Sequence, residues 1–373
     1  MAGIYIHIPF CRKACHYCNF HFSTTHSLLP QMVEAIVKEV MLQKEYLSET
    51  VDTIYFGGGT PSLCTMQEVQ IILSAITTVF SVNKDAEITL EANPDDITED
   101  KLMAWKNIGI NRLSIGVQSF VEDDLRWMNR AHNANQAIKS IQLAQQFGFT
   151  NITIDLIYGT PTLSNEQWHY NVQTAINLGI THLSCYALTV EPKTALNKMI
   201  EQKKIANIEV EKQAHHFELL MHWLAGAGYE HYEISNFAKP GHRSKHNSAY
   251  WQGKTYLGLG PSAHSFNGKS RQWNIANNAL YMVSITQNMV PFTLEELTQI
   301  QQLNEYIMTS IRTLDGISLP YIGQVWGEAM ATNALQNAQP FIQSQLLILH
   351  ENNLQLTNAG KLLADGISAD LFQ

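Results

Sequence analysis

The feature that most constrains the fold is an alternation of strand-like and helix-like segments that runs to about residue 190. Six short segments have the apolar, β-branched composition of buried strands: Ile4–Ile8, Val51–Phe56, Ala86–Glu91, Arg112–Val117, Asn151–Leu156 and Thr181–Ala187. Stretches with helical spacing of apolar residues lie between them: Leu29–Tyr46, Met66–Phe80, Gln136–Phe147 and Gln167–Leu178. This alternation predicts parallel βαβ units and an α/β fold. Right-handed crossovers allow such units to form a flat sheet or an open, partial barrel.

Three of the five cysteines lie within eight residues, directly after the first strand-like segment. Cys11, Cys15 and Cys18 have the spacing CxxxCxxC. Three thiolates on one short loop can each bind one iron of a cubane 4Fe-4S cluster, which leaves the fourth iron without a protein ligand. An iron of that kind can bind a substrate. The spacing therefore favours an iron–sulfur cluster with one open position.

Zinc and disulfide chemistry are the alternatives for these cysteines. A zinc site could be completed by His16 or His21, but structural zinc usually takes four ligands that come as two separated pairs. Three clustered cysteines cannot all pair with one another in disulfides. The remaining two, Cys64 and Cys185, lie in apolar surroundings that are typical of inert buried thiols.

Polar motifs follow the strand-like segments at the ends where parallel sheets place their binding sites. The second segment continues into the glycine-rich residues 57–61, and the third ends at Glu91. The fourth is followed by Gln118, and the fifth carries Asp155. A ligand-binding role is favoured for the two carboxylates, because an unpaired charge at the end of a buried strand would be costly.

The composition limits the location and the partners. The 373 residues are 45% apolar, enough for a large core, and the longest apolar runs are far shorter than a membrane span. The N-terminus has no features of a signal peptide, so we expect a cytoplasmic protein whose cysteines stay reduced. A formal charge of −9, without basic runs longer than two residues, argues against nonspecific nucleic-acid binding.

The C-terminal region has a different pattern. The spacing predicts one helix over Leu294–Leu314, and further on a hairpin formed by Leu346–His350 and Leu354–Thr357. A last helix is expected to begin at Thr357. Helices followed by a hairpin resemble a small winged-helix-like α+β domain. Because the region is not markedly basic, we interpret it as a cover or a partner surface rather than a DNA-binding domain.

Residues 239–251 form a second group of chemically active side chains, dense in histidine, basic and aromatic residues. Imidazole can ligate heme iron, aromatic rings can stack on a macrocycle, and Arg243 or Lys245 could pair with propionates. Taken by residue type alone, the segment is more typical of an ordinary polar loop with a buried tryptophan.

The CxxxCxxC motif, preceded by Tyr5-x-His7-x-Pro9-Phe10, resembles the radical S-adenosylmethionine (SAM) superfamily. The resemblance implies that SAM occupies the open iron through its amino and carboxylate groups. It also favours a partial (β/α)6 barrel with a winged-helix-like C-terminal domain. The implied division is a barrel over residues 1–235, a connecting region over 236–292 and the C-terminal domain over 293–373.

The resemblance to the coproporphyrinogen-oxidase-like branch of this superfamily also implies roles for particular residues. The implied cluster ligands are Cys11, Cys15 and Cys18. The implied SAM-binding residues are Tyr5, Tyr17, Gly58, Gly59, Thr60, Glu91, Gln118, Arg130, Asp155 and Ala187. No catalytic residue is assigned.

A further motif resembles one group within this branch. His246, Asn247, Tyr250 and Trp251 match the HNxxYW pattern of the HemW-type heme chaperones, and the segment 258–264 is also shared with the branch. The resemblance implies a protein that binds heme through this motif, together with a 4Fe-4S cluster and SAM. Its partners would be acceptor hemoproteins such as respiratory enzymes, with peripheral membrane association only through the acceptor, and a homodimer is left open.

The alternative function is that of an oxygen-independent coproporphyrinogen III oxidase, a radical SAM enzyme that decarboxylates a porphyrinogen. Three features argue against it: Tyr5 lies too close to Met1 for the N-terminal extension of the oxidases, Phe20 stands where they commonly carry a further cysteine, and HNxxYW belongs to the chaperones. Action on another tetrapyrrole-like substrate also stays open, as does the question whether the chain is an enzyme.

Overall fold

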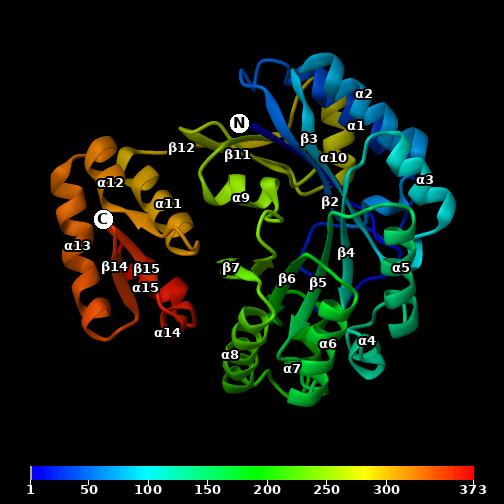
Figure 1. Cartoon of the computed structure of the whole chain (residues 1–373). Helices are drawn as coiled ribbons and strands as arrows, with labels where there is room; N and C mark the ends of the chain where they lie inside the picture. The colour runs from blue at the N-terminus through cyan, green and yellow to red at the C-terminus, as the bar shows by residue number, and fades with distance from the viewer. Residues whose placement is uncertain (1) are drawn as a thin grey trace.

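The structure, a computed structural model, describes residues 2–373 and contains a large curved sheet and a small C-terminal module (Figure 1). Six consecutive strands pair in parallel, as the alternation predicted. They are β1 (Ala2–Ile8), β2 (Val51–Gly58), β3 (Val82–Ala92), β4 (Arg112–Gln118), β5 (Ile152–Tyr158) and β6 (His182–Ala187). Most of their residues are buried, which explains the continuous apolar runs in the sequence.

Helices cover the outside of this sheet and connect its strands (Figure 1). They are α1 (Leu29–Leu42), α2 (Met66–Val79), α3 (Glu99–Asn107), α4 (Glu122–Trp127), α5 (Ala134–Gln146), α6 (Asn165–Asn177), α7 (Ala195–Glu201) and α8 (Val210–Gly226), with short 3-10 turns at Pro61–Leu63 and Pro94–Asp96. Local sequence sets several helix starts. The Thr98 side chain, for example, accepts a hydrogen bond from the backbone N–H of Lys101 and so caps α3.

The sheet extends beyond the six strands on both sides. On one side β9 (Thr255–Leu259) pairs in parallel with β1, followed by the antiparallel strands β10 (His264–Phe266), β11 (Ser270–Asn274) and β12 (Phe292–Glu296). On the other side β8 (Asn236–Ala238) and β7 (Glu230–Glu233) follow β6. The end strands β12 and β7 do not pair with each other, so the barrel is open. The division of the chain at residues 235 and 292 stays a prediction.

The connecting region contributes two helices, α9 (Lys245–Trp251) and α10 (Asn278–Thr286). Helix α10 packs against α1, and α9 contacts β1 and β2. Residues of the connecting region therefore become part of the barrel, although its six central parallel strands lie within the first 190 residues. Pairing of β9 with β1 brings this about, because it returns the chain to the first strand.

The expectation of one helix over Leu294–Leu314 was wrong at its start. Residues 292–296 form β12, which pairs with β11, and the helix α11 (Gln299–Ile311) begins after the cap residue Thr298. The backbone hydrogen bonds that β11 offers outweigh the weak helical spacing of these few residues.

The predicted C-terminal α+β module is confirmed and has its own apolar core around Leu303, Ile307 and Leu354. Its remaining elements are β13 (Ile317–Ser318), α12 (Leu319–Trp326), α13 (Glu328–Gln343), β14 (Leu347–His350), β15 (Asn353–Leu356), α14 (Asn358–Lys361) and α15 (Ala364–Asp370). The strands pair antiparallel in the order β13-β15-β14, and β14 and β15 form the expected hairpin. Over residues 2–373, no helix combines the length and the hydropathy that crossing a membrane requires.

Candidate functional site

The cysteine loop follows β1 and is held in place by several hydrogen bonds from neighbouring segments. The backbone N–H of Cys11 donates to the carbonyl of Ser23 at 3.0 Å. The side chain of Asn129 donates to the carbonyl of Ala14 at 2.7 Å. The imidazole of His16 bonds the carbonyl of Trp127 at 2.8 Å. This contact ties the cysteine loop to the end of α4 and uses one of the two ring nitrogens of His16.

The three thiols fit the donor set of an iron–sulfur cluster. Cys11, Cys15 and Cys18 are all free and half-buried. Burial, with smaller effects from the other two thiols, raises the pKa of Cys11 to about 11. Among the described residues, no three histidine, cysteine or acidic side chains converge as ligands to a single metal ion. A cubane does not require such convergence, because each thiolate binds a different iron.

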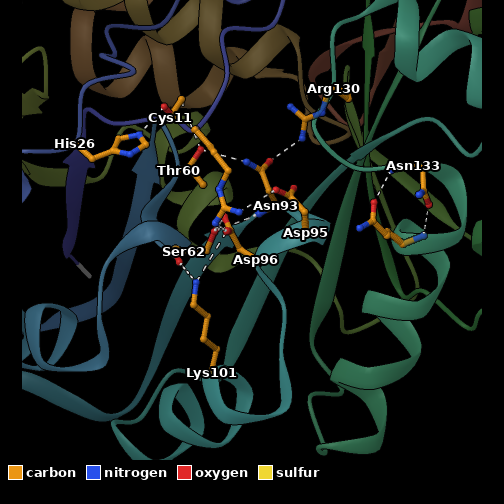
Figure 2. Close-up of polar contacts among 12 residues, drawn as sticks. Cys11, His26, Thr60, Ser62, Asn93, Asp95, Asp96, Lys101, Arg130 and Asn133 are labelled. Carbon is orange, nitrogen blue, oxygen red and sulfur yellow. Dashed lines mark hydrogen bonds and ion pairs between the residues drawn. The ribbon is translucent and has the colours of Figure 1, made fainter.

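Figure 2 shows how polar contacts join this loop to the strand ends beside it. The hydroxyl of Thr60 donates to the Cys11 sulfur at 3.5 Å, and the side chain of Asn93 donates to the Thr60 hydroxyl at 3.2 Å. The guanidinium of Arg130 donates to Asn93 Oδ1 at 2.7 Å, and its other terminal nitrogen lies 3.2 Å from the Cys15 sulfur. Thr60, Asn93 and Arg130 thus form a continuous chain from one cysteine to another.

Asn93 is a site residue that was not predicted from the sequence. It directly follows β3 in the segment that begins at Glu91, so its position at a strand end was the available signal. Asp96, which is 2% exposed, was not predicted either. Its carboxylate pairs with Arg12 of the cysteine loop and accepts a hydrogen bond from Ser62 at 2.8 Å (Figure 2). These contacts tie the loop to the ends of β2 and β3.

Two half-buried carboxyl groups, Glu91 and Asp155, lie on the inner side of the sheet. Burial, and secondarily the charge of Asp155, raise the pKa of Glu91 to about 8. Burial also raises the pKa of Asp155 to about 6, against the opposing effect of Arg112. Glu91 accepts a hydrogen bond from the Tyr55 hydroxyl at 2.8 Å. Because the two carboxyl groups are not neutralised by each other, a cationic group of a ligand would stabilise their ionised forms.

The glycine-rich segment lies close to the cysteine loop. Gly58 has a φ of +103°, and a Cβ atom there would lie 2.6 Å from the His7 ring. A Cβ atom on Gly59 would lie 2.5 Å from the carbonyl oxygen of Phe10. A side chain at either position would therefore displace the strand that leads into the cysteines. Gln118, at the end of β4, is buried and has a left-handed φ of 66°.

The other residues that the resemblance associates with SAM lie on the same rim or next to it. Tyr5 lies in β1 and its ring stacks on Tyr55 of β2, with centroids 6.1 Å apart. Tyr17, between two of the cysteines, packs against an apolar cluster that includes Met128 and Leu188. Ala187 is the last residue of β6 and packs against the main core.

The HNxxYW residues form the short helix α9, which begins after the cap residue Ser244. His246 is 2% exposed and stacks on Tyr55 with ring centroids 4.9 Å apart. Its Nδ1 lies 2.7 Å from the Thr53 hydroxyl, and its Nε2 lies 2.9 Å from the Tyr250 hydroxyl. Both ring nitrogens are therefore hydrogen-bonded.

The four motif residues do not converge on one point. Tyr250 turns toward Tyr256 of β9, with the two rings edge to face at 4.6 Å. Trp251 lies under the guanidinium of Arg312, which belongs to the C-terminal region. The backbone N–H of Asn247 donates to Ser244 within the helix cap. The motif thus contributes one residue to the barrel interior, one to an aromatic wall and one to the contact with the C-terminal module.

A pocket of about 340 Å³ opens beside the cysteine loop. Its wall is built by β1, the residues directly after Cys18, α9, β9 and β10. Its aromatic and imidazole side chains are Tyr5, His7, Phe20, His21, Tyr250, Tyr256 and His264. The volume falls within the range of small-molecule sites, and rings of this kind suit a flat, largely apolar ligand.

Comparison with known proteins supports a common ancestry over nearly the whole chain. Residues 5–175 match the family model of the radical SAM superfamily, and residues 297–363 match that of the HemN C-terminal domain. The chain is 32% identical to a protein of Bacillus subtilis named heme chaperone HemW, over 98% of each chain. It is 33% identical to the heme chaperone HemW of Mycobacterium tuberculosis, over 99% of this chain and 94% of that protein.

A solved structure shares the whole fold. Coproporphyrinogen III oxidase (HemN) from Escherichia coli, a radical SAM enzyme, superposes with a TM-score of 0.86 at 24% identity, over all of this chain and 90% of that one. This likeness covers both the open barrel and the C-terminal module.

Proposed function

Because the chain belongs to the HemW-type heme chaperones of the radical SAM superfamily, we propose that it binds heme and passes it to acceptor hemoproteins. In this proposal Cys11, Cys15 and Cys18 hold a 4Fe-4S cluster, and SAM binds at the strand ends beside it. Bound there, the cluster supplies an iron that coordinates SAM and can pass it an electron.

The protein's own residues would prepare that site in three ways. Arg130 places a positive charge beside the Cys15 sulfur, which stabilises a thiolate. Asn93 holds Arg130 and Thr60 in fixed positions between the cysteines and the glycine-rich segment. Glu91 and Asp155 offer carboxylates that would be stabilised by a cationic ligand such as SAM.

The observation that carries the heme proposal is the pocket beside the cysteine loop. Tyr250 of the HNxxYW motif forms part of its wall, together with residues that follow Cys18. The motif therefore borders the same space as the cluster loop. A macrocycle seated there would contact both aromatic rings and imidazoles.

Decarboxylation of coproporphyrinogen III remains the second candidate function, and the fold shared with HemN is compatible with it. The relatives named as chaperones and the HNxxYW motif favour the first candidate. We also propose a cytoplasmic location, since five free cysteines suit a reducing compartment. The acceptor hemoprotein would then meet the chaperone there or at a membrane surface.

One preparation can test both candidates. The cluster is reconstituted anaerobically, heme binding is followed by absorption titration, and coproporphyrinogen III turnover is measured with SAM and a reductant present. We expect stoichiometric heme binding and no protoporphyrinogen IX. Sustained decarboxylation over many turnovers would instead identify the protein as an oxidase.

A further inference from the structure

The pocket beside the cysteine loop contains three imidazoles, and they differ in their hydrogen bonds. His7 is buried, with its Nε2 2.9 Å from the carbonyl oxygen of His21 and its Nδ1 3.2 Å from the Tyr5 hydroxyl. The Nε2 of His21 lies 2.7 Å from Asn278 Oδ1. The ring nitrogens of His264 have no hydrogen-bond partner among residues 2–373, and the residue is exposed.

His246 is less suited to binding iron than His264. Its imidazole is 2% exposed, and an iron atom could reach either nitrogen only after the bond to Thr53 or the bond to Tyr250 had broken. His246 also does not border the pocket, whereas its partner Tyr250 does. Its contacts support a wall of the pocket rather than the ligand inside it.

Close strand packing, a left-handed turn and a ring contact restrict the position of the His264 side chain. A Cβ atom on Gly258 would lie 2.1 Å from the carbonyl oxygen of His264, so only glycine allows β9 to pass this close to β10. Ser262, which borders the pocket, holds a left-handed φ of 65° in the turn between the two strands. The His264 ring also stacks on Trp273 of β11, with centroids 6.0 Å apart and planes at 26°.

We propose that His264 is the axial ligand to the iron of bound heme, and that His246 is a positioning residue that acts through Tyr250. This assignment rests on the proposed function and identifies the side chain that binds the heme iron. An unpartnered imidazole at a pocket wall can give a lone pair to heme iron without breaking any contact of the fold. Tyr250 and Tyr256, which border the same pocket, would contact the macrocycle.

The assignment can be tested by titrating hemin into the cluster-loaded protein and following the heme absorption spectrum. We expect His264→Ala to lower the hemin affinity at least tenfold and to change the spectrum of the heme that still binds. Added imidazole should restore the spectrum of the parent protein in this variant. His264→Met should bind heme with a third, distinct spectrum, because the ligand atom changes from nitrogen to sulfur.

Two matched variants serve as controls. His21→Ala removes another imidazole of the same pocket and should leave the spectrum unchanged. His246→Ala should weaken hemin binding but preserve the spectrum, since the iron ligand is still present. Cluster content and SAM binding, measured on every variant, identify any that have not folded.

The outcomes separate the ligand assignment from the function itself. If the parent protein binds no hemin, the proposed function and the assignment both fail. If the parent protein binds hemin and folded His264→Ala and His264→Met do so with the same affinity and spectrum, only the assignment is overturned. It is likewise overturned if His246→Ala or His21→Ala is the variant that changes the spectrum.

Discussion

The carboxyl groups of Glu91 and Asp155 depend strongly on what binds beside them. Burial raises the pKa of both, so a positively charged ligand would offset part of the free-energy cost of ionising them. Neither effect could be read from the sequence alone, which identified only two acidic residues at strand ends. Their shared position in the barrel interior supplies the physical reason for a cation there.

We expect Glu91→Gln and Asp155→Asn each to weaken SAM binding by about 1–3 kcal/mol, through lost hydrogen bonds to charged groups. The cluster absorbance should persist in both. Asp85→Asn is a suitable control, because it removes an exposed carboxylate from the same strand as Glu91. Equilibrium binding of SAM to the reconstituted protein measures the effect. Unchanged affinity in both site variants would contradict the assignment of these residues.

The cysteines divide into two groups that differ in exposure. Replacing Cys11, Cys15 or Cys18 with Ala should abolish most of the cluster absorbance after anaerobic reconstitution, because each is proposed to bind a separate iron. Cys64→Ala and Cys185→Ala remove buried thiols and should retain it. A complete loss in Cys64→Ala would show that the ligand set is wrong.

Among the elements, α1 is joined to three segments of the sheet extension by the buried side chain of Glu39. Glu39 of α1 accepts hydrogen bonds from the backbone N–H of Gly260 at 2.7 Å, the Tyr281 hydroxyl at 2.6 Å and the Asn274 amide at 2.6 Å. Despite these bonds, burial raises the pKa of Glu39 to about 7. The carboxyl group thereby makes the docking of β9, β11 and α10 sensitive to pH.

This pKa predicts a pH dependence of the free energy of unfolding. Between about pH 4.5 and 7 the unfolded chain binds fewer protons at Glu39 than the folded protein does, so stability falls as the pH rises through this interval. Over this pH interval the free energy of unfolding falls by roughly 3 kcal/mol at most. Glu39→Gln should lack this pH dependence. Glu34→Gln, which changes an exposed residue of the same helix, should keep it. Denaturant unfolding of the cluster-free proteins at pH 5 to 8 measures the difference. Parallel profiles for parent and Glu39→Gln proteins would contradict the prediction.

In the whole molecule, the C-terminal module meets the barrel partly through backbone hydrogen bonds. The N–H of Ile234 donates to the carbonyl of Arg312, and that of Leu314 donates to the carbonyl of Tyr232. The guanidinium of Arg312 lies 5.5 Å from the ring centroid of Trp251. The last residue of the HNxxYW motif thus links the helix of that motif to the module. Figure 1 shows α9 between the barrel and α11 of the module.

Trp251→Ala should loosen this attachment, since a cation–π contact contributes about 0.5–2 kcal/mol. We expect faster amide hydrogen exchange at residues 312–314 and faster proteolysis of the module, with the cluster retained. Trp223→Ala removes a half-buried tryptophan of α8 and is the matched control. Equal exchange rates in the parent and Trp251→Ala proteins would mean that the backbone bonds alone hold the module.

The sequence by itself determined the six parallel strands, the cysteine loop and the C-terminal hairpin. Each depends on local patterns: apolar runs, ligand spacing and a polar turn between strands. The helix predicted over Leu294–Leu314 failed at its start because β12 depends on a partner strand rather than on its own spacing. The periodicity of apolar residues was compatible with a flat sheet or a barrel. The resemblance to the radical SAM superfamily favoured the barrel.

Only the tertiary structure decided which residues meet. It placed Asn93 between Thr60 and Arg130, and it enclosed His246 within two hydrogen bonds while leaving the His264 ring unbonded at a pocket wall. The position of Asn93 follows from the parallel pairing of β2, β3 and β4. The positions of the two histidines follow from the pairing of β9 with β1, which brings segments about 250 residues apart into contact. The spacing of residues along the chain does not predict such pairing, because burial and hydrogen bonding are set by neighbours that are distant in the sequence.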